Sequence, residues 1–207
     1  MHKKQILQSG KNVSESEAVL IMLHGRGAGA RDILSLASHF PVANFALLAP
    51  QATNNTWYPY SFMAEPGDNE PWLSSAIEVL NDLVDHLYSV GKNSNGIYFL
   101  GFSQGACLAL EFVSRKPNRY GGVVAFTGGL IGDRIYAENY KGSFENAPVF
   151  IGTSDVDSHV PVERVYDTER IMRAMNADVT LKVYPGMDHT ITADEIKDAI
   201  TAVFTRY

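Results

Sequence analysis

A mainly parallel β-sheet with α-helices on both faces is predicted for this 207-residue chain from three observations. Short runs of consecutive apolar residues, typical of strands buried on both faces, alternate with stretches of helical periodicity. No internal repeat, low-complexity tract or interdomain linker interrupts this alternation. A hydrophobic content of 45% with 19% charged residues is typical of an ordered globular protein. We therefore expect a single α/β domain over residues 1–207.

The elements of the first half follow from apolar runs and turn residues. Residues 3–8 are expected to form an edge strand. The run Ala18–Leu23 is the first strand apolar enough for burial on both faces, and Phe45–Ala49 is the next. Between them, a glycine-rich loop over 24–30 leads into a helix around Asp32–His39. The segment Gln51–Glu70 has no regular pattern, and its aromatic residues argue against disorder.

The second half repeats the strand and helix units. The spacing of apolar residues predicts a helix over 72–90 and another over 162–176. Thr192 and Glu195 form a capping box that begins the final helix. The remaining strands are expected at 97–100, 122–126, 149–151 and 179–184. In such sheets the ligand site lies beyond the carboxyl ends of the strands.

Charge and cysteine content exclude several classes of protein. The net charge is −6 and no cluster of Lys or Arg is present, so we expect no nucleic-acid partner. The single cysteine, Cys107, cannot form an internal disulfide, which favours a reducing compartment. No segment resembles a signal peptide or approaches the ~20 apolar residues that span a bilayer. The sequence therefore predicts a soluble, cytoplasmic protein without a membrane span.

The pattern Gly101-Phe102-Ser103-Gln104-Gly105 follows a strand and precedes an apolar helical run. A sharp turn from strand to helix would hold Ser103 at its apex, accessible as a nucleophile. Glycines on either side let strand and helix approach without a Cβ clash. The alternative is a glycine-rich turn that contains an ordinary serine, so the rest of the chain must supply a base and an acid.

Candidates for base and acid follow later strands. Asp155 and Asp157 come after the strand at 149–151, and His189 follows the last strand. The order Ser, Asp, His is that of an α/β-hydrolase triad. In such a triad His189 would take the Ser103 proton, and a carboxylate would orient the imidazole and stabilise its charged form. Spacing alone leaves both aspartates open.

An oxyanion hole is predicted from the loop His24-Gly25-Arg26-Gly27. In these enzymes the hole uses the N–H after the nucleophile and one from the loop after an early strand, here those of Gln104 and Arg26. The alternative for the loop is a turn that only leads into a helix. No set of His, Cys, Asp and Glu has zinc-like spacing, so we expect no metal.

Together these pieces resemble the phospholipase/carboxylesterase branch of the α/β-hydrolases, which includes the acyl-protein thioesterases. The matching pieces span nearly the whole chain: Leu-His-Gly at 23–25, Ala-Pro-Gln-Ala at 49–52, Trp57-Tyr58, Gly-Phe-Ser-Gln-Gly-Ala at 101–106, Asp157-x-x-Val160-Pro161 and Gly186-Met187-x-His189. The family's motif places the acid on the aspartate of Asp-x-x-Val-Pro, which is Asp157. Thr56–Phe62 with Asn69-Glu70-Pro71 is similar to a bacterial subgroup of hydrolases.

The resemblance implies a small-lidded α/β-hydrolase fold and a serine carboxylesterase that cleaves esters of small to medium acyl chain through an acyl-serine, without a cofactor. Lysophospholipase or acyl-protein thioesterase activity is the alternative. A third reading is a non-catalytic module that binds a small molecule. We expect Trp57, Tyr58 and Phe62 to line the substrate pocket, or else to pack in the core under the long loop. Homodimers are common in this family, so a homodimer is a possible assembly.

Overall fold

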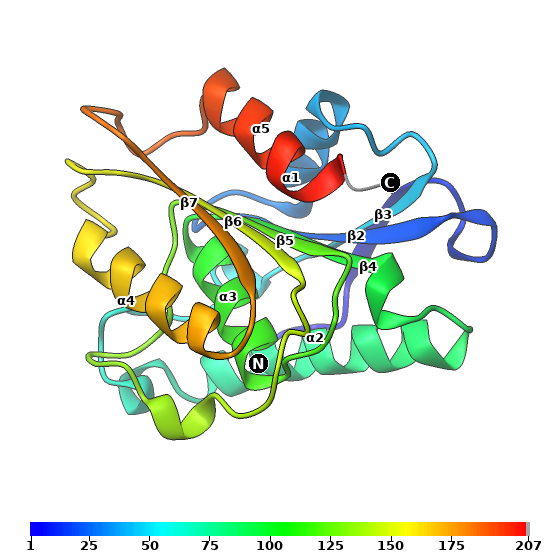
Figure 1. Ribbon diagram of the computed structural model, residues 1–207. Helices are drawn as coiled ribbons and strands as arrows, with labels where there is room; N and C mark the ends of the chain where they lie inside the picture. Colours follow the sequence, from blue (N-terminus) through cyan, green and yellow to red (C-terminus); the bar gives the residue numbers. More distant parts are fainter. Residues whose placement is uncertain (206–207) are drawn as a thin grey trace.

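The computed structural model describes residues 1–205, and a seven-stranded sheet runs through its centre (Figure 1). The strand order is β1-β3-β2-β4-β5-β6-β7, in which only β1, at the edge, is antiparallel to its neighbour. This confirms the predicted sheet. The strands are β1 (Ile6–Gly10), β2 (Ala18–Leu23), β3 (Phe45–Pro50), β4 (Ile97–Phe102), β5 (Gly122–Phe126), β6 (Pro148–Ser154) and β7 (Asp178–Tyr184).

Helices cover both faces of the sheet, α1 and α5 one face and α2, α3 and α4 the other (Figure 1). Side chains alternate across each strand, so Val19 and Ile21 of β2 pack towards α2 and α3, while Leu20 and Met22 pack towards α1 and α5. Burial on both faces explains the continuous apolar runs. The helices are α1 (Ala30–Ser35), α2 (Trp72–Ser89), α3 (Gln104–Arg115), α4 (Val162–Ala174) and α5 (Ala193–Ala199), which continues as the π-helical turn η7 (Ile200–Phe204).

Several boundaries differ from the expectations, two of them in the first half of the chain. The edge strand β1 lies at Ile6–Gly10 and not at 3–8, because all five of its residues pair with β3, from Ile6 opposite Pro50 to Gly10 opposite Ala46. The helix after the first glycine-rich loop ends at Ser35 and continues as the 3-10 helix η2 (Leu36–His39). The helix α3 begins at Gln104, immediately after Ser103, in agreement with the predicted turn from strand to helix.

The segment between β3 and α2 has only two short 3-10 helices, η3 (Thr53–Asn55) and η4 (Pro66–Asn69). Trp57, Tyr58 and Phe62 of this segment are nevertheless all buried. Ordered packing of a long connection is typical of a functional loop. Among the described residues, no helix is both long and apolar enough to cross a membrane.

Candidate active site

Ser103 occupies a strained turn between β4 and α3. Its φ and ψ are 54° and −119°, a left-handed conformation that costs a non-glycine residue free energy. A Cβ added to Gly101 would lie 2.4 Å from the carbonyl oxygen of Gly105, and one added to Gly105 would lie 2.1 Å from that of Leu23. Both positions therefore require glycine, and the turn holds the serine hydroxyl clear of the sheet.

Two loops from neighbouring strands bring a base and an acid to this serine. His189, after β7, has its Nε2 2.8 Å from Ser103 Oγ, and its Nδ1 lies 2.6 Å from Asp157 Oδ2, after β6. An imidazole protonated on Nδ1 donates to Asp157 and accepts from the Ser103 hydroxyl. The Asp157 side chain is fully buried, whereas His189 is partly exposed. The structure thus brings together the three residues predicted from the sequence.

The two aspartates of the β6 loop have different partners. Asp157 accepts the backbone N–H groups of His159 and Val160 through Oδ1, at 2.7 and 2.9 Å. Burial raises the pKa of Asp157, but the hydrogen bonds from His189 and these two N–H groups outweigh it and hold the pKa below its usual range. Asp155 instead accepts the N–H of Gly186 at 2.8 Å. Geometry therefore places Asp157 on the imidazole and leaves Asp155 to brace the β7 loop.

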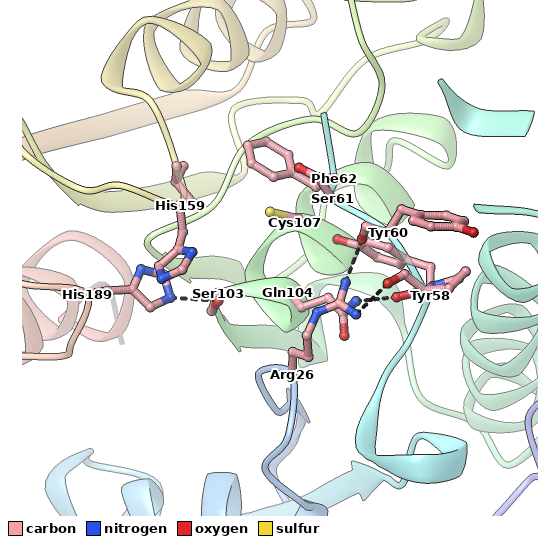
Figure 2. Close-up of a pocket in the computed structure, with 12 residues that line it drawn as sticks. Arg26, Tyr58, Tyr60, Ser61, Phe62, Ser103, Gln104, Cys107, His159 and His189 are labelled. Carbon is pink, nitrogen blue, oxygen red and sulfur yellow. Dashed lines mark hydrogen bonds between the residues drawn. The ribbon is translucent and has the colours of Figure 1, made fainter. Parts of the chain in front are cut away.

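A cavity of about 430 Å³ opens in front of Ser103 (Figure 2). Tyr58 and Phe62 border it, as expected, together with Cys107 and Val160. Trp57 does not border the cavity and takes the alternative position in the core, where its indole is fully buried and its Nε1 donates to the His24 carbonyl at 2.9 Å. Trp57, in the long loop, thus binds the backbone of the glycine-rich loop at His24.

Side chains of the two proposed oxyanion residues hold one wall of the cavity. Gln104 accepts the Trp57 N–H at 2.9 Å and donates to the Tyr58 carbonyl at 2.8 Å. The Arg26 guanidinium donates from Nη1 to the Pro59 carbonyl at 2.8 Å and from Nη2 to that of Tyr60 (Figure 2). These bonds could not be predicted from the sequence, because side chains that bond backbone carbonyls leave no pattern in it.

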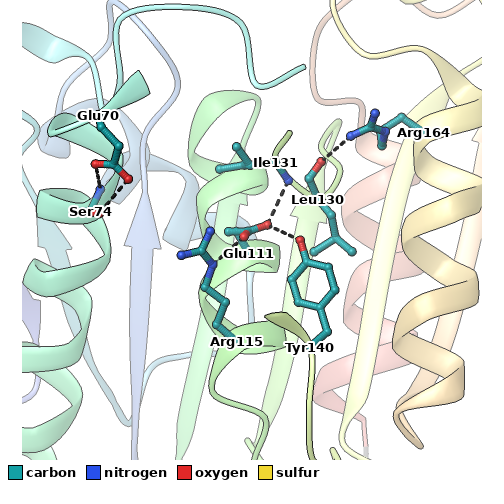
Figure 3. A network of polar contacts seen from close by, with 8 residues as sticks. All are labelled: Glu70, Ser74, Glu111, Arg115, Leu130, Ile131, Tyr140 and Arg164. Atoms are coloured by element: carbon teal, nitrogen blue, oxygen red, sulfur yellow. Dashed lines mark hydrogen bonds and ion pairs between the residues drawn. The ribbon is translucent and has the colours of Figure 1, made fainter. Parts of the chain in front are cut away.

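Two buried charged residues, Glu111 and Arg164, hold the chain that follows β5 (Figure 3). Glu111 of α3 accepts the Ile131 N–H at 3.0 Å and the Tyr140 hydroxyl at 2.9 Å. Arg164 of α4 donates to the carbonyls of Leu130 and Gly132. The N–H of Gly132 in turn donates to the Phe62 carbonyl at 2.7 Å. The chain after β5 is therefore held from two helices and supports the loop that carries Phe62.

Three other residues near Ser103 could in principle act as a nucleophile or a base, and each has a different environment from the triad residues. Burial raises the pKa of the Cys107 thiol to about 12, so the sulfur stays protonated at neutral pH and is a poor nucleophile. His24 braces its loop, with Nδ1 2.8 Å from the Gly25 carbonyl and Nε2 accepting the Ala52 N–H. His159 is exposed, with its ring 4.8 Å from that of His189. Within residues 1–205, no cluster of His, Cys, Asp and Glu could hold a metal ion.

Comparison with known proteins identifies a family and several relatives that this chain is similar to. A family model described as phospholipase/carboxylesterase matches residues 4–206. Acyl-protein thioesterase 1 of Kluyveromyces lactis is 28% identical over 134 residues, which cover 62% of this chain and 58% of that protein. Its counterpart in Saccharomyces cerevisiae is 33% identical over 100 residues, 47% of this chain and 44% of that protein. The chain thus spans only about half of the length of these curated relatives.

Solved structures match over nearly the whole chain. A phospholipase/carboxylesterase from Dyadobacter fermentans is 48% identical, with a TM-score of 0.97 over 99% of this chain and 98% of that one. A Bacillus cereus carboxylesterase is 21% identical, with a TM-score of 0.79 over 98% of this chain and 94% of that one, a likeness of fold alone. These matches confirm the predicted α/β-hydrolase fold.

Proposed function

The chain belongs to the phospholipase/carboxylesterase family, and from this premise we propose that it is a serine carboxylesterase with Ser103, His189 and Asp157 as its triad. The observation that carries the proposal is the continuous hydrogen-bonded chain from Ser103 Oγ through the imidazole to the buried carboxylate. A strained nucleophile, a base within reach of it and an oriented acid are the components that acyl transfer needs.

The proposed reaction begins when Ser103 Oγ attacks the ester carbonyl while its proton moves to His189 Nε2. Asp157, ionised at neutral pH because its pKa is low, stabilises the imidazolium that forms. His189 then gives the proton to the leaving alcohol, and the acyl group stays on Ser103. Water, activated by His189 in the same way, releases the acid and restores the serine.

The backbone N–H groups of Arg26 and Gln104 are proposed to stabilise the oxyanion. Gln104 is the first residue of α3, where free N–H groups favour negative charge. Arg26 also borders the cavity, and its side chain and that of Gln104 are fixed by the 57–60 loop. Fixed donors stabilise the transition state without having to reorganise, and one such donor contributes about 3 kcal/mol.

A lysophospholipase or acyl-protein thioesterase is the second candidate, favoured by the relatives named acyl-protein thioesterase 1. The cavity of about 430 Å³ supports the short-chain ester instead, because a long acyl chain needs a longer groove. We expect p-nitrophenyl acetate and butyrate to be cleaved with higher kcat/KM than the octanoate. A clear preference for octanoate would favour the second candidate.

The triad is tested with Ser103→Ala, Asp157→Asn and Asp155→Asn on the preferred ester. Loss of the nucleophile or of the orienting acid is expected to lower kcat by roughly 10⁴-fold or more. Asp155→Asn should stay near wild type, because an amide oxygen can still accept the Gly186 N–H. Activity that survives Ser103→Ala would contradict the mechanism, whereas loss in Asp155→Asn with normal Asp157→Asn would move the acid to Asp155.

A further inference from the structure

The described residues that line the cavity include basic side chains and no acidic ones. Its lining includes Arg26 and two histidines but no aspartate or glutamate among the residues that the structure describes. This is unexpected in a chain of net charge −6. A site lined in this way favours a substrate group of negative charge.

Arg26 is the permanent cation of this lining. No carboxylate of residues 1–205 lies within ion-pair distance of its guanidinium. The carbonyls of Pro59 and Tyr60 fix its orientation, yet a guanidinium has more N–H donors than these two bonds use. The side chain is therefore held in place with its charge unneutralised and part of its planar fork unused, the arrangement that binds a carboxylate.

The two sides of Ser103 correspond to the two parts of an ester. Figure 2 shows His189 and His159 on one side of Ser103, and Gln104, Arg26 and the Tyr58–Tyr60 wall on the other. His189 has to protonate the leaving oxygen, so the alcohol lies on the histidine side. The acyl chain is left with the space in front of the opposite wall, where the Arg26 guanidinium lies.

From this arrangement, and on the basis of the proposed esterase function, we infer that the preferred substrates are esters whose short acyl group ends in a carboxylate. They are monoesters of small dicarboxylic acids, and Arg26 is the residue that selects them. The cavity of about 430 Å³ admits an acyl group of this size.

The test compares monoethyl succinate with ethyl 4-methylpentanoate, in which an uncharged isopropyl group replaces the carboxylate, by titrating the acid released. A hydrogen bond to a charged group predicts a kcat/KM for the succinate ester roughly tenfold to a hundredfold higher in the wild type. Raising NaCl from about 50 to about 500 mM should reduce this ratio, because salt screens the ion pair. A wild type that prefers the uncharged ester would overturn the inference, and this result needs no variant.

Substitutions of Arg26 then test whether this residue causes the preference for the carboxylate ester. Arg26→Met should bring the ratio of the two kcat/KM values close to one, and Arg26→Lys should retain part of it, because the charge remains without the planar fork. Arg31→Met is the matched control, since Arg31 is an exposed arginine of α1 outside the cavity lining, and it should keep the wild-type ratio. If Arg26→Met lowers both rates equally, Arg26 acts only on the loop and the inference is wrong. Failure of the esterase proposal looks different, because then neither ester is cleaved in a Ser103-dependent manner.

Discussion

The nucleophile half of the site and its acid–base half are held by different forces. Ser103 is fixed by backbone packing, since β4, α3 and the end of β2 approach so closely at Gly101 and Gly105 that a methyl group does not fit. Asp157 and His189 lie on loops after β6 and β7 and are fixed by hydrogen bonds. Steric packing tolerates no substitution, whereas a hydrogen bond can be kept by a different residue. The two halves should therefore respond differently to mutation.

The largest effect is expected from Gly105→Ala in the nucleophile half. The new Cβ would lie 2.1 Å from the Leu23 carbonyl oxygen and 2.6 Å from that of His24, both in the backbone. The end of β2 cannot move aside without disturbing its pairing with β4, so we expect a loss on the order of 4 kcal/mol in the free energy of unfolding, or no folding. Urea denaturation measures it.

Gly67→Ala is the matched control for this substitution. A Cβ at Gly67, in η4, meets no atom within 4 Å, so its stability should stay within about 0.5 kcal/mol of wild type. Equal stability of the two variants would contradict the steric account of the serine turn.

This difference also explains which parts could be predicted from the sequence. The turn at Ser103 needs glycines at fixed positions, so its sequence pattern is local and specific. Asp155 and Asp157 could not be separated by spacing, because both follow β6 and both accept hydrogen bonds in the structure. Trp57 lies in the core, the second of the two places that the sequence left open, since an aromatic residue under a long loop has the same sequence pattern whether it faces a cavity or the core.

A second prediction concerns Glu195, which lies against β6, the strand that precedes the Asp157 loop. It is the third residue of α5 and fully buried, with Oε1 lacking a partner among the described residues and lying 2.5 Å from where a Gly152 Cβ would be. Burial raises its pKa from the ordinary 4.5 to about 7, against the hydrogen bonds from Thr192. The folded state therefore favours the protonated acid beneath β6.

Because the pKa of Glu195 is raised on folding, the free energy of unfolding depends on pH through this residue. The stabilisation that the protonated Glu195 carboxyl contributes is fully present below pH 4.5, its pKa in the unfolded chain. It is lost as the pH rises through about 7, its pKa in the folded protein. Glu195→Gln cannot titrate, so between about pH 5 and about pH 8 its unfolding free energy should fall less than that of wild type, by on the order of 2–3 kcal/mol. Glu163→Gln, an exposed glutamate in the first turn of α4, is the control and should follow the wild type. Parallel curves for wild type and Glu195→Gln would mean that Glu195 is ionised in the folded protein.

The smallest effect is expected at Asp155, where a single exposed hydrogen bond braces the loop that carries His189. Asp155→Ala leaves the Gly186 N–H to water, a loss of about 1 kcal/mol that would lower kcat/KM roughly fivefold through a less fixed imidazole. Asp155→Asn keeps an oxygen acceptor and should restore most of the rate, with the same pH profile as the wild type. An alanine variant with unchanged kcat/KM would show that the β7 loop holds His189 without this bond. The acid–base half would then depend on Asp157 alone.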